Sequence, residues 1–257
     1  LELLCPEGVM AFARINNLKK LDAEVLELVK MIEPDEVDDA SILTNLGKMM
    51  NNPTLDGVAV EKPVGIGVAM SAMGPLPIVM MPLSDPAAFS VKTAGNENVR
   101  VLGTFAIWSP DPDLAASVKV AEKPSALVQS LLEGDISVAI DAEQVKPMIV
   151  PYLGMMDEYV EMMKQMMPGP VGEFYAEMAV GMKAFIMDAE SLVYAANLKD
   201  GQLEFVERYT AKEGTETAKS IAAVKTSRAN LLGYVDSADF LALEMRCGGE
   251  EIWESFG

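Results

Sequence analysis

The chain has 257 residues, half of them hydrophobic and 23% charged, which is the composition of a packed globular protein. Its 39 acidic residues against 20 basic ones give a formal charge of −19, and this field repels phosphate backbones and anionic lipid heads. The composition therefore argues against a nucleic-acid partner and against a membrane surface held by charge. No histidine is present, which excludes every catalytic triad or metal site that requires an imidazole.

Two cysteines, Cys5 and Cys247, lie near opposite ends of the chain. They form either one disulfide that closes nearly the whole chain or two unrelated thiols, and the sequence leaves both readings open.

The chain begins Leu-Glu-Leu-Leu without an initiator Met, so we expect an upstream segment such as a signal peptide. Leu3 and Leu4 stand where a lipoprotein cleavage site has small residues, so no lipid is expected on Cys5.

The first elements expected are a strand and two helices. Apolar residues alternate from Val9 to Ile15, which is the period of a strand with one buried face. An apolar stripe of helical spacing from Leu18 to Ile32 predicts a helix, Pro34 interrupts the chain, and a second helix is expected from Ile42 to Met49.

Two strands and a helix complete this first unit. The uncharged stretch 64–84 is long enough to span a bilayer, but six glycines and prolines interrupt it. Two buried strands, at about 64–70 and 76–83, explain it better than a transmembrane helix. The sequence Ser84-Asp85-Pro86 then predicts the start of a helix, because it pairs capping side chains with a proline in the first turn.

The same order of elements recurs from Ile136, at an offset of 136 − 9 = 127 residues. The strand and helix start VMAFARINNLKKL matches ISVAIDAEQVKPM in pattern. A helical hairpin interrupted by Pro168-Gly169-Pro170 follows, and then strands at about 192–198 and 203–209 around a turn with Gly201. A closing helix is expected from Thr215.

These matches predict an α+β fold with two tandem β-α-α-β-β-α units, whose antiparallel or mixed sheets pack against helical hairpins. The first unit covers 1–134 and includes an inserted strand at 99–108 and an inserted helix at 124–132. The second covers 135–230. The segment 231–257 is expected to begin a third unit, with a strand from Leu231 to Val235 that pairs with a preceding sheet or with another chain.

The opening Cys-Pro-Glu-Gly-Val-Met-Ala-Phe-Ala-Arg-Ile, followed by Asn-Asn-Leu-Lys-Lys-Leu and repeated in degenerate form from Ile136, resembles a class of large exported bacterial proteins without an assigned activity. Those proteins begin each unit with a short Pro-acidic segment, a strand and a helix. The resemblance implies export to the periplasm or the cell exterior, and it implies no catalytic residues.

Motifs of enzyme chemistry are absent from the sequence, including a phosphate loop, a dinucleotide fingerprint and a nucleophile elbow. Asp111 and Asp113 are the calcium candidates, together with an acidic cluster at 35–39, although neither has the glycine and closing glutamate of an EF-hand. Residues that begin a helix explain both clusters as well. No cofactor is expected.

Methionine is concentrated in the second helical hairpin, which holds ten of the 19 in the chain between Met148 and Met187. A stripe from Tyr152 through Met162 to Met166 is expected to pack inward, and the neighbouring methionines widen it. The interpretations are a soft core, an adaptable apolar groove, or a thioether copper site. The predicted groove residues are Met155, Met156, Tyr159, Met162, Met163, Met166, Met167, Met178 and Met182.

The function that the sequence favours is a non-catalytic exported protein that binds a protein partner or assembles with copies of itself. A carrier of a lipid or another hydrophobic small molecule in the methionine-lined groove is the alternative. A carboxylate-dependent enzyme is the second alternative, because any acidic protein offers candidate pairs. If the groove is a docking surface, Met163→Asp should abolish the association and leave the fold intact.

Overall fold

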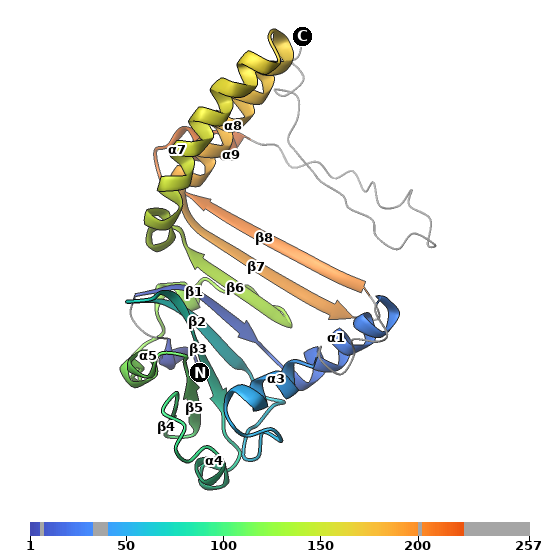
Figure 1. Ribbon diagram of the computed structural model, residues 1–257, viewed down its shortest axis with the longest axis vertical. Coiled ribbons are helices and arrows are strands. Elements are labelled where there is room, and N and C mark those ends of the chain that lie inside the picture. Colours follow the sequence, from blue (N-terminus) through green and yellow to red (C-terminus); the bar gives the residue numbers. More distant parts are fainter. Residues whose placement is uncertain (6–7, 33–40, 200–201, 224–257) are drawn as a thin grey trace.

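A computed structural model describes residues 1–5, 8–32, 41–199 and 202–223 (Figure 1). The fold is mixed α+β, with a single eight-stranded antiparallel sheet in the order β4-β5-β3-β2-β1-β6-β7-β8. The strands are β1 Val9–Ile15, β2 Val64–Ser71, β3 Gly74–Pro82, β4 Val99–Leu102, β5 Phe105–Trp108, β6 Ile136–Asp141, β7 Ala189–Lys199 and β8 Gln202–Ala211.

The described helices lie over the faces and the ends of this sheet. In Figure 1, α1 and α3 lie at one end of the strands, and α7 and α8 form a long hairpin that projects from the other end. The helices are the 3₁₀ turn η1 Glu2–Leu4 and the α-helices α1 Leu18–Ile32, α3 Ile42–Met49, α4 Pro86–Lys92, α5 Pro112–Ser117, α6 Ala126–Gln129, α7 Ala142–Met166, α8 Pro170–Asp188 and α9 Glu216–Ala223.

Strands β1 and β6 pair with each other, so the sheet runs without a break from the first half of the chain to the second. Phe12 lies opposite Ala139, and Ile15 lies opposite Ile136. Each of these strands is followed by two described helices and then by two further strands on its outer side.

One apolar core lies on each face of the sheet. The first core contains Ile15, Val64 and Val79 from the strands, and Leu18 from α1 packs onto them. The second core surrounds Phe12, which is completely buried, and is closed by residues of η1, α5 and α6. The inserted segment 99–134 therefore supplies the cover for the second face.

Several predicted elements have different bounds in the structure. The inserted strand expected at 99–108 is a hairpin of two short strands, β4 and β5, because Gly103 adopts a φ of +60° in the turn between them. The inserted helix is only four residues long, and β7 and β8 extend beyond the predicted limits. The expected third unit from Leu231, the acidic cluster at 35–39 and Cys247 lie outside the described residues.

Across the described part of the chain, no helix combines the length and the apolar character needed to cross a bilayer.

Candidate interaction site on the helical hairpin

The hairpin of α7 and α8 is positioned by its ends. The Asp141 carboxylate accepts the backbone N–H groups of Glu143 and Gln144, which caps α7 directly after β6. At the other end of α7, Gly169 adopts a φ of +99° and Pro170 provides the first residue of α8. The sequence Pro168-Gly169-Pro170 thus reverses the chain, as the sequence predicts.

The base of the hairpin is held by a buried lysine. The Lys146 ammonium donates to the carbonyl oxygen of Ala189 at 2.7 Å and pairs with the Glu143 carboxylate at 2.6 Å. Lys212 also contacts Glu143, at 2.8 Å. Hydrogen bonds from Lys146 and Lys212 lower the pKa of Glu143 below its usual value. This cluster connects α7 to the start of β7 and to the segment after β8.

Side chains between the two helices recur at helical spacing, and all are buried or half-buried. Gly172 lies so close to α7 that an added Cβ would be 2.0 Å from the carbonyl oxygen of Met167. The small residues of α8 therefore receive the larger side chains of α7. This interface contains Leu153, Met156, Val160 and Met163 on α7 with Met167 directly after it, and Gly172, Ala176, Ala179, Lys183 and Ile186 on α8.

A second set of side chains is apolar and exposed, and each member directly precedes a residue of that interface. One residue back along an α-helix is a rotation of about 100°. Because the two helices run antiparallel, the same rotation turns both sets toward the same side of the hairpin. We call this side the M-face; it contains Tyr152, Met155, Tyr159, Met162 and Met166 on α7, and Val171, Tyr175, Met178, Met182 and Phe185 on α8.

The ten side chains of the M-face are each between 40% and 69% exposed among the described residues. None of them is charged. The opposite side of the hairpin carries Asp157, Glu161 and Lys164, and there Lys183 reaches from the interface to pair with Asp157 at 2.7 Å. The hairpin is therefore amphipathic from side to side, and its apolar side faces outward.

The structure corrects the predicted direction of the methionine stripe. The stripe from Tyr152 to Met166 was expected to pack inward, whereas it is exposed. The residues between the helices are instead the neighbouring methionines, Met156, Met163 and Met167, which are half-buried. The reason is that α7 packs mainly on α8 and leaves the sheet after its first turns (Figure 1). Among the residues that the structure describes, nothing covers the second apolar stripe of a helix that leaves the sheet.

Six of the nine predicted groove residues lie on the M-face: Met155, Tyr159, Met162, Met166, Met178 and Met182. The predicted groove did not include Val171, Tyr175 or Phe185, which also lie on the M-face. The sequence does contain a pattern that could have identified these residues. Each directly precedes Gly172, Ala176 or Ile186, and the two small residues mark the side on which another helix approaches closely.

The M-face continues onto the sheet at the base of the hairpin. Phe185 stacks on Tyr209 of β8, with ring centroids 3.9 Å apart, and the Tyr209 hydroxyl donates to the Phe185 carbonyl oxygen. Farther along the same face of β7 and β8, the rings of Tyr194 and Phe205 are 5.7 Å apart. The M-face thus meets the outer strands at Tyr209, and the exposed Glu207 lies between Tyr209 and Phe205 on the same face of β8.

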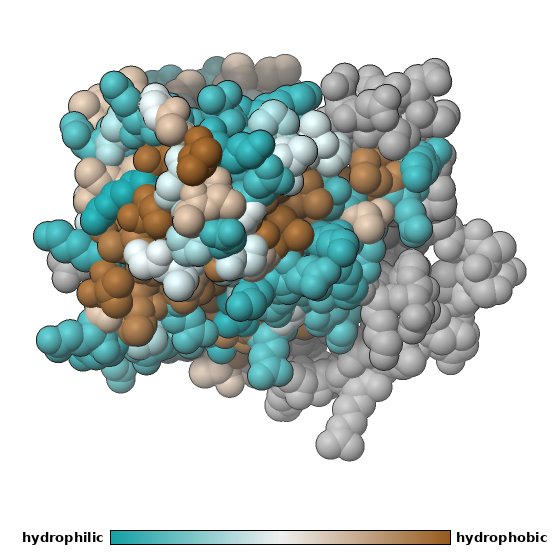
Figure 2. Space-filling view, turned by 90° about the horizontal axis from the view of Figure 1, so that it is seen from below, coloured by the Kyte–Doolittle hydropathy of each residue, from teal (hydrophilic) through white to brown (hydrophobic). Residues whose placement is uncertain are grey.

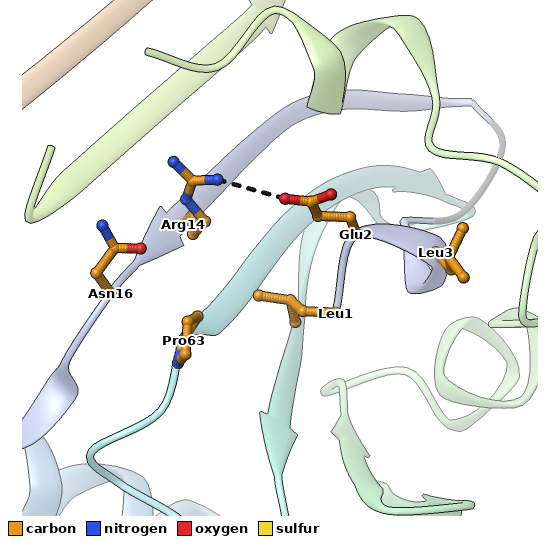
Figure 3. A pocket seen from close by; sticks show the side chains of 6 residues that line it. All are labelled: Leu1, Glu2, Leu3, Arg14, Asn16 and Pro63. Atoms are coloured by element: carbon orange, nitrogen blue, oxygen red, sulfur yellow. Dashed lines mark ion pairs between the residues drawn. The ribbon is translucent and has the colours of Figure 1, made fainter. Parts of the chain in front are cut away.

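A cavity of about 350 Å³ lies elsewhere, between η1 and the ends of β1 and β2 (Figure 3). Leu1, Glu2, Leu3, Arg14, Asn16 and Pro63 line it. Arg14 pairs with Glu2 at 3.5 Å, and it also donates to the Leu132 carbonyl oxygen. Asn16 donates to the Gly134 carbonyl oxygen. Arg14 near the end of β1 and Asn16 just after it therefore hold the 132–134 segment in place, which is a structural role.

The calcium candidates occupy the start of a helix. The Asp111 carboxylate accepts the Asp113 N–H and caps α5, and Pro112 occupies the first turn. No group of three or more potential metal-ligating side chains occurs within the described ranges.

Apolar side chains also gather on the end of the molecule opposite the hairpin, where hydrophilic residues interrupt them (Figure 2). That surface lacks the uninterrupted helical spacing of the M-face.

Comparison with known proteins identifies no matching family, because no protein-family model, no curated protein and no solved structure matches the chain.

Proposed function

We propose that this protein is a non-catalytic binding protein, and that the M-face of the α7–α8 hairpin docks on a partner polypeptide. The observation that carries the proposal is a set of ten large apolar side chains exposed on one side of a projecting hairpin. A monomer seldom leaves an apolar patch of more than a few hundred Å² in water, and larger patches mark interaction sites. Methionine suits such a surface because its flexible thioether adapts to the shape of a partner.

The M-face favours a protein partner over a small apolar ligand. Ligand sites are concave and bury most of the ligand. The M-face instead runs along the side of two packed helices, and the cavity in Figure 3 is lined by other residues. A long, exposed helical surface is the form in which proteins present an interface to another helix.

We further propose that the chain contains a duplicated β-α-α-β-β-α unit, as the sequence matches suggest. The element order β1-α1-α3-β2-β3-α4 recurs as β6-α7-α8-β7-β8-α9. In the strand order β3-β2-β1-β6-β7-β8, the strands β1, β2 and β3 of one unit mirror β6, β7 and β8 of the other about the β1–β6 pair. The matched positions Phe12 and Ala139 pair with each other. On this view, the M-face belongs to a hairpin that lengthened in one copy only. Export of the protein stays a prediction.

Site-specific photo-crosslinking tests the proposed docking surface. A photo-reactive phenylalanine analogue is placed at Tyr159 on the M-face, or at Val180 on the opposite side of α8 as a matched control that is 64% exposed. In cells that produce the protein, the analogue at position 159 should give adducts heavier than the chain, and the analogue at 180 should not. Products formed only within one chain at position 159 would reject the proposal.

The substitution that tests the docking surface is Met162→Asp, and not the Met163→Asp that the sequence suggested. Met163 lies between the two helices, so Met163→Asp would bury a carboxylate and disrupt the hairpin itself. Met162→Asp places the charge on the exposed M-face, where the unfolding free energy should change by less than about 0.5 kcal/mol. The crosslinks from position 159 should disappear in that variant.

A further inference from the structure

We infer that the outer edge of β8 pairs with the same edge of a second copy of this chain, so that two eight-stranded sheets join into one. The inference concerns a different surface from the M-face and does not depend on the proposed function. It rests on the open edge of β8 and on the order of the charged side chains along this strand.

The edge of β8 that faces away from β7 is long and open. The strand has ten residues and lies last in the sheet (Figure 1). Within the described ranges, its backbone forms ladder hydrogen bonds with β7 only. The outer strand at the other end of the sheet, β4, has four residues. Alternate residues of an outer strand point their N–H and C=O groups away from the sheet, so β8 offers these groups to another strand.

Two-fold symmetry limits the registers in which β8 can pair with itself. In an antiparallel pair of identical strands, the axis stands perpendicular to the sheet, and each residue lies opposite one that points to the same side. Because sides alternate along a strand, the numbers of two opposite residues must have an even sum. Two registers then pair nearly the whole strand. One is centred on Val206 and pairs 202–210, and the other is centred on Glu207 and pairs 203–211.

The charged side chains favour the register centred on Val206. In this register Glu204 lies opposite Arg208 of the other copy, and the symmetry forms this pair of opposite charges twice; both side chains are exposed in the single chain. Arg208 already donates to the Ser130 carbonyl oxygen, but a guanidinium group has five N–H donors and can bind a carboxylate as well. The register centred on Glu207 would place two Glu207 carboxylates opposite each other, and like charges in that position destabilise a sheet.

The same register covers apolar surface. Val206, which is 42% exposed, would lie opposite Val206 of the other copy, and Phe205, which is 58% exposed, would lie opposite the aliphatic stem of Glu207. The charge of −19 on each chain opposes the association. We therefore expect a dimer that forms as the protein concentration is raised.

Two charge reversals and their mixture test the inference on the full chain. Analytical ultracentrifugation of the unchanged protein should show a concentration-dependent dimer. Arg208→Glu and Glu204→Arg each place like charges in both pairs, so each should raise the dissociation constant of the dimer by about tenfold or more. When the two variants are mixed, every carboxylate of the pairs again meets a guanidinium group. Heterodimers should then form as readily as the dimer of the unchanged protein.

The matched control is Glu207→Arg, which changes the net charge by the same amount on the same strand but lies opposite Phe205. It should change the dissociation constant by less than about threefold. Met162→Asp on the M-face should leave the dimer unchanged.

The other outcomes overturn the inference. A protein that stays monomeric at every concentration up to its solubility limit would reject it, and so would a mixture that forms no more dimer than either variant alone. If Glu207→Arg weakens the dimer as much as Glu204→Arg, the strands do not pair in this register. If Met162→Asp abolishes the dimer and Glu204→Arg does not, the M-face joins the two copies instead of β8.

Discussion

At the scale of single residues, the structure gives Lys146 the role of fastening the hairpin to the sheet. Its ammonium group is almost fully buried and donates to the Ala189 carbonyl oxygen. Lys146→Met keeps the aliphatic stem but leaves that carbonyl without its donor. We expect the unfolding free energy to fall by about 1–3 kcal/mol in urea titrations, the cost of an unsatisfied buried polar group.

The matched control for this prediction is Lys164, whose pair with Glu161 is exposed near the tip of the same helix. Lys164→Met should change the unfolding free energy by less than about 0.5 kcal/mol, because exposed ion pairs contribute little. Equal effects of the two substitutions would show that the buried contact of Lys146 does not stabilise the hairpin.

At the scale of elements, the close approach of α7 and α8 depends on Gly172. A methyl group at this position would overlap the Met167 carbonyl oxygen, so Gly172→Ala must push the helices apart. We expect a loss of about 1–3 kcal/mol, which is typical of overpacking. Gly181→Ala in the same helix meets no atom within 4 Å, and should stabilise the protein by about 0.4–1 kcal/mol.

Thermal or chemical unfolding followed by circular dichroism separates the two glycine variants. If Gly172→Ala is as stable as Gly181→Ala, the helices do not pack as the structure places them.

The hairpin also shows how far sequence reasoning reaches. The strand from Val9, the break at Pro168-Gly169-Pro170 and the cap before α4 follow from local chemistry, and the structure has all three. Local chemistry does not decide which of the two neighbouring stripes on α7 packs inward, because both stripes are apolar. The choice depends on a non-local fact, namely that α8 rather than the sheet covers most of α7.

The pairing of β1 with β6, which joins the two halves of the chain, also could not be predicted from the local sequence pattern. Alternation in β1 predicts a strand with one buried face, but it does not name the neighbouring strand. The continuous sheet arises because β6 pairs with the edge of β1 that β2 leaves open. Residues of the 99–134 segment then cover the second face, and this segment interrupts the repeated order in the sequence.

At the scale of the whole molecule, the β1–β6 pairing should make the two halves unfold together. Phe12 lies at the centre of this pairing and is completely buried. Phe12→Ala should cost about 3–5 kcal/mol, and urea unfolding should remain a single transition whether it is followed by near-ultraviolet or far-ultraviolet circular dichroism. Two separate transitions, with only one shifted by the substitution, would show that the halves fold as independent domains.

The M-face is the central element of this account, and methionine oxidation tests its exposure directly. The chain provides internal standards, because Met73 is 74% exposed at the β2–β3 turn and Met80 is completely buried. After brief treatment of the monomer with hydrogen peroxide, mass spectrometry measures the oxidation rate of each methionine. We predict that Met155, Met162 and Met166 oxidise at rates close to that of Met73. Rates as slow as that of Met80 would mean that the chain itself covers this surface, and would contradict a docking role for the hairpin.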